Sequence, residues 1–223
     1  MNPRPGRWAG MALGGIFGAL ARARGTRALH AVGVCGGGSL EFKPGTDHGV
    51  PLLSGSRSHS CLVRASRALG LRSLPDIEGL ALRIDGPDGG DLLFASTGAG
   101  MVTRHLLVPR LPFRLGTLTT LMPLQTAGGG LLLRLEPERG SRGHPGQRRA
   151  QRPPTAYRVW IAAPGRPWHE RGRLDVAWDD SDCSRRHDPV GHPPAGTWFA
   201  ATWARLRDPS YAASQRTPAR IED

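Results

Sequence analysis

The residues with the clearest chemistry lie near the end of the chain, where Arg207 and Tyr211 are four positions apart. Residues at this spacing share one face of a helix. An arginine beside a phenol favours the ionised phenolate, because the opposite charge stabilises it. A phenolate is a hard anionic ligand that suits ferric iron. The spacing is compatible with a C-terminal helix on which Arg207 keeps Tyr211 ionised, as an iron ligand would require.

Pro209 lies between these two residues and would break a continuous helix. It can instead be the first residue of a new helix that Asp208 caps. In that geometry Arg207 must reach Tyr211 across a bend. Taken alone, the same spacing is also typical of a solvated helix face.

The residues around this pair resemble the haem-ligating segment of catalases, which reads D-P-x-x-x-P-P-G and then R-x-x-x-Y-x-x-[ST]-[QH]-R. The matching positions are Asp188, Pro189, Pro193, Pro194, Arg207, Tyr211, Ser214, Gln215 and Arg216. The resemblance implies that Tyr211 is the proximal ligand of the iron in haem b, with Arg207 as its charge partner.

A second segment, closer to the N-terminus, resembles the distal motif of the same family, R-x-x-H-A-x-G-x-x-x-x-G. It matches at Arg27, His30, Ala31, Gly33 and Gly38. The resemblance implies that His30 is the acid/base residue above the haem and that Arg27 binds a haem propionate. A lone histidine in a strand is otherwise usually structural.

The third segment, CLVRAS at residues 61–66, resembles the family's V-R-F-S, although Ala65 replaces the aromatic residue. By this resemblance Arg64 is a second arginine that binds a propionate. Ser66 is then the hydroxyl that hydrogen-bonds the distal imidazole and fixes its tautomer.

Two further segments resemble adjoining catalase motifs. Asp76, Gly79, Ala81 and Arg83 match D-x-x-G-x-A-x-[KR], and residues 91–97, DLLFAST, match D-L-V-G-N-N-T in part. Ser96 lies where the family has the catalytic asparagine that orients peroxide. A hydroxyl is shorter and less directional than a carboxamide, so the resemblance implies weak rather than efficient peroxide disproportionation.

The elements that must position these residues are mainly strands. Alternating or apolar patterns predict strands at 28–35, 61–66, 115–124, 130–135, 156–162 and 172–178. The sequence GPDGG at 86–90 predicts a hairpin turn between two more strands, and the glycines at 36–38 predict a bulge or tight turn. About eight short antiparallel strands commonly close into a barrel that can hold one ligand. The expected fold is mainly β (α+β), a catalase-like antiparallel β-barrel of about eight strands followed by the haem-ligating helix.

The composition agrees with short strands and many turns, because the 223 residues include 31 glycines and 20 prolines. The net charge is +12, and Lys43 is the only lysine. Such a charge permits binding to nucleic acid or anionic lipid, but the arginines are spread along the chain with few aromatic residues among them. We therefore expect no specific nucleic-acid partner. The basic stretch 139–154 is interpreted as an exposed loop, with a site for an anionic partner as the alternative.

The three cysteines, Cys35, Cys61 and Cys183, form no C-x-x-C pair. Their odd number and wide spacing argue against a disulfide framework and favour a reducing cytoplasm. Residues 179–192 contain a further group of metal-ligand types, which are Asp180, Asp182, Cys183, His187, Asp188 and His192. Their spacing matches no closed zinc site, so a metal-dependent phosphodiesterase is only a minor alternative.

Residues 1–24 are expected to form an N-terminal helix or arm before a single haem-binding domain, residues 25–223. The basic start, the apolar run 8–21 and its small residues also resemble a signal peptide, so secretion is an alternative to the cytoplasm. The run is too short to span a membrane, and we expect no transmembrane segment.

These observations together predict a small catalase-like haem protein that acts on peroxide or small organic hydroperoxides. The chain is much shorter than a typical catalase, which implies a more open haem pocket and favours peroxidase chemistry. A homo-oligomer is compatible with the sequence. One alternative is a non-enzymatic haem-binding relic of the fold, and another is a basic protein that binds polyanions.

Overall fold

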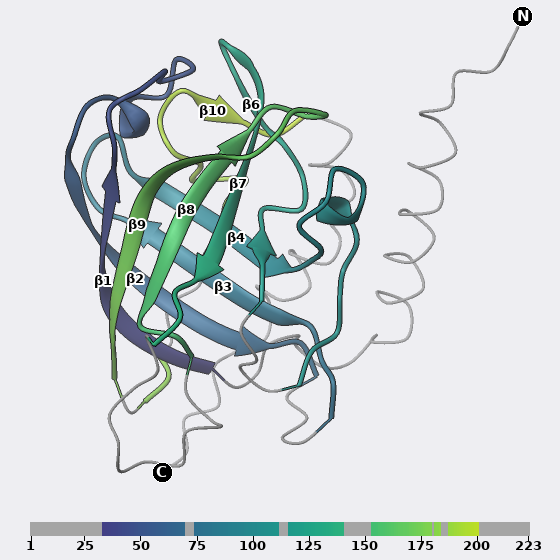
Figure 1. Ribbon diagram of the computed structural model, residues 1–223. Helices are drawn as coiled ribbons and strands as arrows, with labels where there is room; N and C mark the ends of the chain where they lie inside the picture. Colours follow the sequence, from purple (N-terminus) through teal and green to yellow (C-terminus); the bar gives the residue numbers. More distant parts are fainter. Residues whose placement is uncertain are drawn as a thin grey trace, which may run out of the picture. The chain divides into compact units, whose positions relative to one another are not determined.

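The computed structural model describes residues 33–69, 74–111, 116–140, 153–179, 181–183 and 187–200, all of which belong to one compact unit, His30–Ala204. Within them, the regular structure consists of strands and two short 3₁₀ helices (Figure 1). The strands are β1 (Gly33–Phe42), β2 (Ser58–Arg67), β3 (Glu78–Ile84), β4 (Gly90–Ser96), β5 (Leu118–Thr119), β6 (Leu124–Thr126), β7 (Gly129–Pro137), β8 (Ala156–Ala162), β9 (His169–Trp178) and β10 (Thr197–Trp198). The 3₁₀ helices are η1 (Pro51–Leu53) and η2 (Thr103–His105).

Eight of the strands close into an antiparallel barrel. Their hydrogen-bonded order is β7–β5–β4–β3–β2–β1–β9–β8, and pairing of β7 with β8 completes the ring. The other two strands continue from β7 in the order β7–β6–β10. Figure 1 shows the barrel strands curving around a common interior. The prediction of an antiparallel barrel of about eight strands is confirmed.

The interior of the barrel is a packed apolar core. Side chains alternate along each strand, so every second residue points inward. These inward residues include Leu40, Phe42, Val63, Leu82, Leu135, Tyr157 and Leu174, each at most 1% exposed. Burial of a side chain of this size contributes about 1.5–3 kcal/mol. A shift of one residue in the pairing of any strand would turn its apolar side chains outward. Burial of these side chains therefore determines the register, and the register determines which residues lie on the outer face.

The glycine run 36–38 lies within β1 and not in a turn, which corrects the expectation from the sequence. β1 stays paired with β2 and β9 through the whole run. A Cβ atom on Gly36 would collide with the carbonyl oxygen of Ala177, and one on Gly38 would lie 2.7 Å from a methyl carbon of Val63. Glycine is needed at these two positions because neighbouring atoms approach the strand closely, and not because the chain reverses.

Other sequence predictions hold with adjusted bounds. The predicted turn at 86–90 joins β3 and β4, with Gly86 at a φ of 93°. The single strand predicted at 115–124 is divided into β5 and β6. Leu121 lies between them with a φ of 60°, a left-handed conformation that interrupts an extended strand.

Three predicted elements fall outside the described residues. They are the N-terminal segment 1–24, most of the loop 139–154, and the C-terminal helix with Arg207 and Tyr211. In the part of the chain that the structure describes, no helix has the length and hydropathy needed to cross a bilayer.

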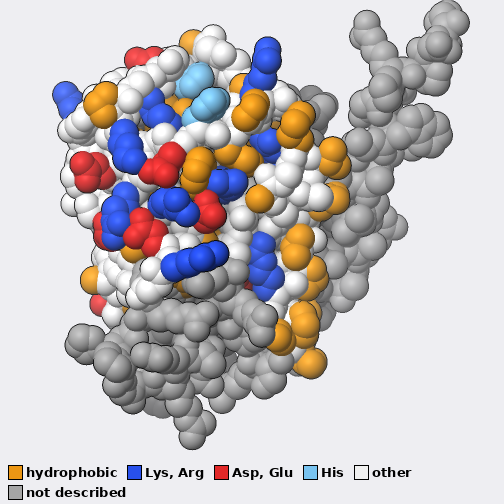
Figure 2. Space-filling view, in the orientation of Figure 1, with side chains coloured by type: hydrophobic (Ala, Val, Ile, Leu, Met, Phe, Trp, Pro, Cys, Tyr) orange, Lys and Arg blue, Asp and Glu red, His pale blue; other side chains and the backbone are white. Residues whose placement is uncertain are grey.

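The surface charge is mixed on the face shown in Figure 2, where acidic side chains are interleaved with the basic ones. Among the described residues, Arg173 pairs with Glu138 at 2.7 Å and with Asp175 at 2.8 Å. Interleaved carboxylates lower the positive potential that a polyanion would meet. Among the described residues on this face, the basic side chains form no continuous patch (Figure 2).

Candidate functional site

The structure describes three of the residues predicted to form the site, Arg64, Ser66 and Ser96. Arg64 and Ser66 belong to β2, and Ser96 is the last residue of β4. The others, Arg27, His30, Arg207 and Tyr211, lie outside the described residues, and their roles stay predictions.

Arg64 and Ser66 lie on the outer face of the barrel. They alternate along β2 with Val63 and Ala65, which are part of the core. The strand register aligns both with mostly small residues on neighbouring strands. Ser66 is in a row with Gly33, Gly79 and Ala95, and Arg64 is in a row with Cys35, Ala81 and Leu93.

We call these two rows of residues, which cross β1, β2, β3 and β4, the outer platform. Adjacent strands are about 4.8 Å apart, so four strands span about 14 Å. A flat ligand as wide as a porphyrin can lie on such a surface, whereas bulky side chains would hold it away. Arg64 supplies a cation and Ser66 a hydroxyl within the platform.

The guanidinium of Arg64 is held by the carboxylate of Asp182, from the segment after β9. Arg64 Nε donates to Asp182 Oδ1 and Nη2 donates to Oδ2, both at 2.8 Å. The backbone N–H of Gly33 also donates to Oδ2, at 2.8 Å. Burial raises the pKa of Asp182, but the hydrogen bonds and charge of Arg64 outweigh burial, and the pKa lies below its usual range. The carboxylate is therefore ionised at neutral pH, and it binds the Nε and Nη2 atoms of Arg64 in a bidentate manner.

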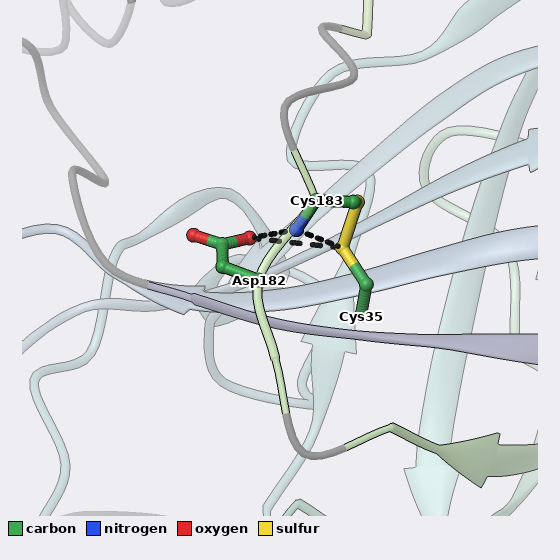
Figure 3. A group of neighbouring side chains, drawn as sticks. All are labelled: Cys35, Asp182 and Cys183. Carbon is green, nitrogen blue, oxygen red and sulfur yellow. Dashed lines mark hydrogen bonds between the residues drawn. A yellow bond between two sulfur atoms is a disulfide. The ribbon is translucent and has the colours of Figure 1, made fainter. Parts of the chain in front are cut away.

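Cys35 on the outer platform forms a disulfide with Cys183, the residue after Asp182 (Figure 3). The two Cα atoms are 5.8 Å apart, although the residues are 148 positions apart in the sequence. The argument against a disulfide framework therefore missed this one bond, whereas Cys61 is free and buried. Wide spacing did not exclude the bond, because the barrel places β1 beside the segment after β9. The argument for a reducing compartment is lost with it.

Ser96 points to the opposite side of the barrel wall from Ser66 and has no exposed surface. Its hydroxyl accepts a hydrogen bond from the N–H of Glu78 at 3.0 Å and donates to the carbonyl oxygen of Val108 at 2.8 Å. Ala95, and not Ser96, is the β4 residue in the row of Ser66. The structure therefore does not bring the two serines together. The contacts of Ser96 connect β3, β4 and the segment after η2.

We expect Ser96→Ala to lower the free energy of unfolding by about 1–2 kcal/mol, because it leaves a buried N–H and a partly buried carbonyl without this partner. Urea denaturation followed by tryptophan fluorescence measures the change. Ser56→Ala, at an exposed position, is the control and should alter stability by less than about 0.5 kcal/mol. Equal effects of the two substitutions would contradict a structural role for the Ser96 hydroxyl.

A second ion pair, between Arg83 and Asp91, connects the motifs at 76–83 and 91–97 with the D-P-x-x-x-P-P segment that begins at Asp188. Arg83 Nε donates to Asp91 Oδ1 at 2.7 Å, and Nη2 donates to Oδ2 at 2.5 Å. The N–H of Asp188 donates to the same Oδ2 at 2.6 Å, and the N–H of Asp91 donates to the carbonyl oxygen of His192 at 2.7 Å. The Asp91 side chain has no exposed surface. This network anchors the D-P-x-x-x-P-P segment at the start of β4.

Of the metal-ligand residues predicted at 179–192, Asp180 lies outside the described residues, and the others separate into two groups. Asp182 and Cys183 lie with Cys35, whereas the later residues lie against Asp91. Among the described residues, the three in the first group have ligand atoms within 4.8 Å of one another. Their two sulfurs are joined in the disulfide and are not thiolate ligands. The geometry therefore gives no support to a metal centre of the phosphodiesterase type.

No protein-family model matches the sequence, and no curated protein matches it. Comparison with solved structures finds similar folds. A bacterial catalase matches with a TM-score of 0.57 and 13% sequence identity, over 94% of this chain and 63% of that chain. A fungal catalase matches with a TM-score of 0.58 and 12% identity, over 90% of this chain and 61% of that chain. The chain therefore has a catalase-like fold and spans less than two thirds of the length of these two structures.

Proposed function

We propose that the chain is a small catalase-like haem protein with peroxidase-like activity towards peroxide or small organic hydroperoxides. The observation that carries the proposal is the outer platform, on which a catalase-like barrel presents Arg64 and Ser66 among small residues. The segments around His30 and Tyr211 support it through their resemblance to the two catalase motifs that flank haem.

The residues of the platform fit a haem. A porphyrin is flat and carries carboxylates at one edge, and arginine binds carboxylates in a bidentate manner. Arg64 would bind one propionate in place of Asp182, and Arg27 would bind the other. Tyr211 would hold the iron, with Arg207 keeping the phenolate ionised. When bound, the haem supplies a ferric centre for peroxide chemistry.

His30 would supply the acid/base function by moving a proton between the two oxygens of the peroxide. Ser66 would fix the tautomer of the imidazole by a hydrogen bond. The β4 residues of the platform, Leu93 and Ala95, have no side-chain donor or acceptor, so they cannot help to orient peroxide. Because β4 contributes no polar side chain to the outer platform, we expect slow disproportionation of peroxide and a preference for peroxidase chemistry.

A non-enzymatic haem-binding relic of the fold is the second candidate. Two observations favour it: β4 contributes only apolar side chains to the platform, and Asp182 already occupies Arg64. Both features are compatible with haem binding but not with efficient turnover.

The cofactor proposal is tested by titrating the full chain with haem and recording its absorption spectrum. A Soret band with a high-spin ferric tyrosinate pattern is expected, and Tyr211→Phe should abolish that pattern because it removes the phenolate. Tyr157→Phe is the matched control, since the chain has two tyrosines and Tyr157 is buried in the core. An unchanged spectrum in Tyr211→Phe would contradict the ligand assignment.

Turnover then separates the enzyme from the relic. With a phenol as electron donor, the haem-loaded wild type should consume peroxide, and His30→Ala should slow this by about 10²–10⁴-fold, the usual contribution of general acid–base catalysis. Haem binding without turnover in the wild type would favour the relic. Turnover that His30→Ala leaves intact would contradict the role of His30.

A further inference from the structure

The Cys35–Cys183 disulfide and the Arg64–Asp182 ion pair form one structural unit. Cys35 and Arg64 are directly opposite each other on β1 and β2, and Cys183 follows Asp182 in the chain. Each member of the ion pair is therefore next to one half of the disulfide. Figure 3 shows the Asp182 carboxylate beside the bridge, with the Cys183 N–H directed towards both the carboxylate and the sulfur of Cys35.

Backbone contacts hold the same segment on β1. The N–H of Cys35 donates to the carbonyl oxygen of Ser181 at 3.0 Å, and the N–H of Asp179 donates to the carbonyl oxygen of Cys35 at 2.8 Å. The disulfide adds a covalent tether to these contacts. A tethered carboxylate has an effective concentration on the order of millimolar or above at its partner. Asp182 is therefore a strong internal competitor for the Arg64 guanidinium.

We infer that the disulfide is a redox-controlled clasp. While it is intact, Asp182 binds the Nε and Nη2 side of Arg64 and excludes other carboxylates from that side, and reduction of the disulfide lets another carboxylate replace Asp182 there. Two carboxylates cannot bind the same bidentate side of one guanidinium at the same time. The inference rests on the proposed function insofar as the incoming carboxylate is a haem propionate.

The switching step is a thiol–disulfide exchange with a dithiol reductant. A thiolate of the reductant attacks the sulfur of Cys183, which is the more exposed of the two cysteines, and the Cys35–Cys183 bond breaks. The second thiol of the reductant then closes the reductant's own disulfide. The reductant loses two electrons, and the two cysteines each gain a proton. The Cys183 N–H, 3.1 Å from the Cys35 sulfur, stabilises the leaving thiolate.

The same residues are less suited to hold a metal after reduction. Asp182 Oδ1 accepts from Arg64 and Cys183, and Oδ2 accepts from Arg64 and Gly33. A carboxylate that accepts four hydrogen bonds beside a guanidinium is a poor ligand for a cation. Cys61 does not intercept the exchange, because burial raises the pKa of its thiol to about 12 and the reactive thiolate is scarce at neutral pH.

The clasp is tested on the full chain without haem, by labelling arginines with phenylglyoxal and locating the products by mass spectrometry. Labelling of Arg64 should accelerate about tenfold when dithiothreitol reduces the protein, because the tether that keeps Asp182 in place is lost. Arg173, whose ion pairs lie at the surface, is the internal reference and should not change. Equal labelling of Arg64 in the oxidised and reduced wild type would overturn the inference.

Two sets of variants complete this test. Cys35→Ser/Cys183→Ser should label Arg64 at the reduced rate with or without dithiothreitol, whereas Cys61→Ser should behave like the wild type. Oxidised Asp182→Asn keeps the disulfide but removes the competing charge, so it should also label Arg64 at the fast rate. A slow rate in oxidised Asp182→Asn would show that Asp182 is not the group that protects Arg64.

Haem titration distinguishes failure of the clasp from failure of the proposed function. Because dithiothreitol reacts with haem, the comparison is between oxidised wild type and Cys35→Ser/Cys183→Ser, which should bind haem about tenfold more tightly. Equal affinities together with unchanged Arg64 labelling would overturn the clasp and leave the haem proposal in place. Redox-dependent labelling without any haem uptake would support the clasp and contradict the haem proposal.

Discussion

Replacement of Arg83 by methionine is expected to lower the free energy of unfolding by about 3–5 kcal/mol, the usual cost of leaving a buried charge without its partner. Methionine keeps much of the apolar stem of Arg83 but leaves the Asp91 carboxylate, which has no exposed surface, without its cation. The same carboxylate accepts the N–H of Asp188, so the change would also loosen the segment after β9. Urea denaturation at pH 7 measures the loss.

Arg173→Met is the matched control, because it too removes an arginine that forms ion pairs, in this case with Glu138 and Asp175. Its side chain is 47% exposed, and exposed ion pairs contribute about 0–1 kcal/mol. The variant Arg83→Met/Asp91→Asn should recover part of the stability, because no charge is then left buried and the Asn oxygen can still accept the Asp188 N–H. A loss in Arg83→Met no larger than in Arg173→Met would contradict the role given to this network.

The same pair predicts a change in the pH dependence of stability. Burial raises the pKa of Asp91, but Arg83 and the Asp188 N–H outweigh burial, and its pKa in the folded protein lies below the ordinary value. In the wild type its contribution is therefore complete above the unfolded carboxyl pKa of about 3.9, and it is lost as the pH falls through the lower folded pKa. In Arg83→Met burial dominates and raises the pKa, so the deficit should shrink as the pH falls from 7 to 5.

The barrel could be predicted because the sequence of most main strands alternates between apolar residues that face the core and residues that face outward. The period-two pattern of Tyr157, Val159 and Ile161 predicts a strand at 156–162, and β8 has the same bounds. These three side chains are part of the core. Where a strand has one face in the core and one outside, a pattern of this kind determines both its extent and its orientation.

The alternation along β4 also determines on which face of the barrel Ser96 lies. Leu92, Phe94 and Ser96 have the same parity along β4, and the first two are core residues. That parity already indicates that Ser96 points inward and that Ala95 points outward. Alignment with a catalase motif gives the position of a residue along the strand but not the face on which it lies. The alternation of apolar residues in the sequence does indicate that face.

The remaining features depend on contacts between distant segments. Cys35 pairs with Cys183 and Arg64 with Asp182 only because β1 and β2 lie beside the segment after β9. No spacing within the sequence encodes that proximity. In the same way, a run of glycines is compatible with a turn or with a closely packed strand, and the neighbouring strands decide between the two.

The glycine run leads to a second large effect. Gly36→Ala is expected to lower the free energy of unfolding by about 3 kcal/mol, at the upper end of the usual cost of overpacking. The added methyl would collide with the carbonyl oxygen of Ala177 and lie 2.9 Å from the Cα atom of Trp178. These are backbone atoms of the paired strand β9, so relief requires β1 and β9 to separate, and rotation of a side chain does not suffice.

Gly37→Ala is the matched control in the next position of the same strand. Within the described part of the chain, no atom would lie within 4 Å of a Cβ atom at position 37, and Gly37 lines an open groove of about 1040 Å³. Alanine should leave stability unchanged there or raise it by up to about 1 kcal/mol, because glycine loses more backbone entropy on folding. Urea denaturation measures the free energy of unfolding of Gly36→Ala and Gly37→Ala relative to the wild type. Equal losses of stability in the two variants would mean that the glycines serve the flexibility of the strand. A loss in Gly36→Ala without a loss in Gly37→Ala would mean that close packing against β9 requires glycine at position 36 but not at position 37.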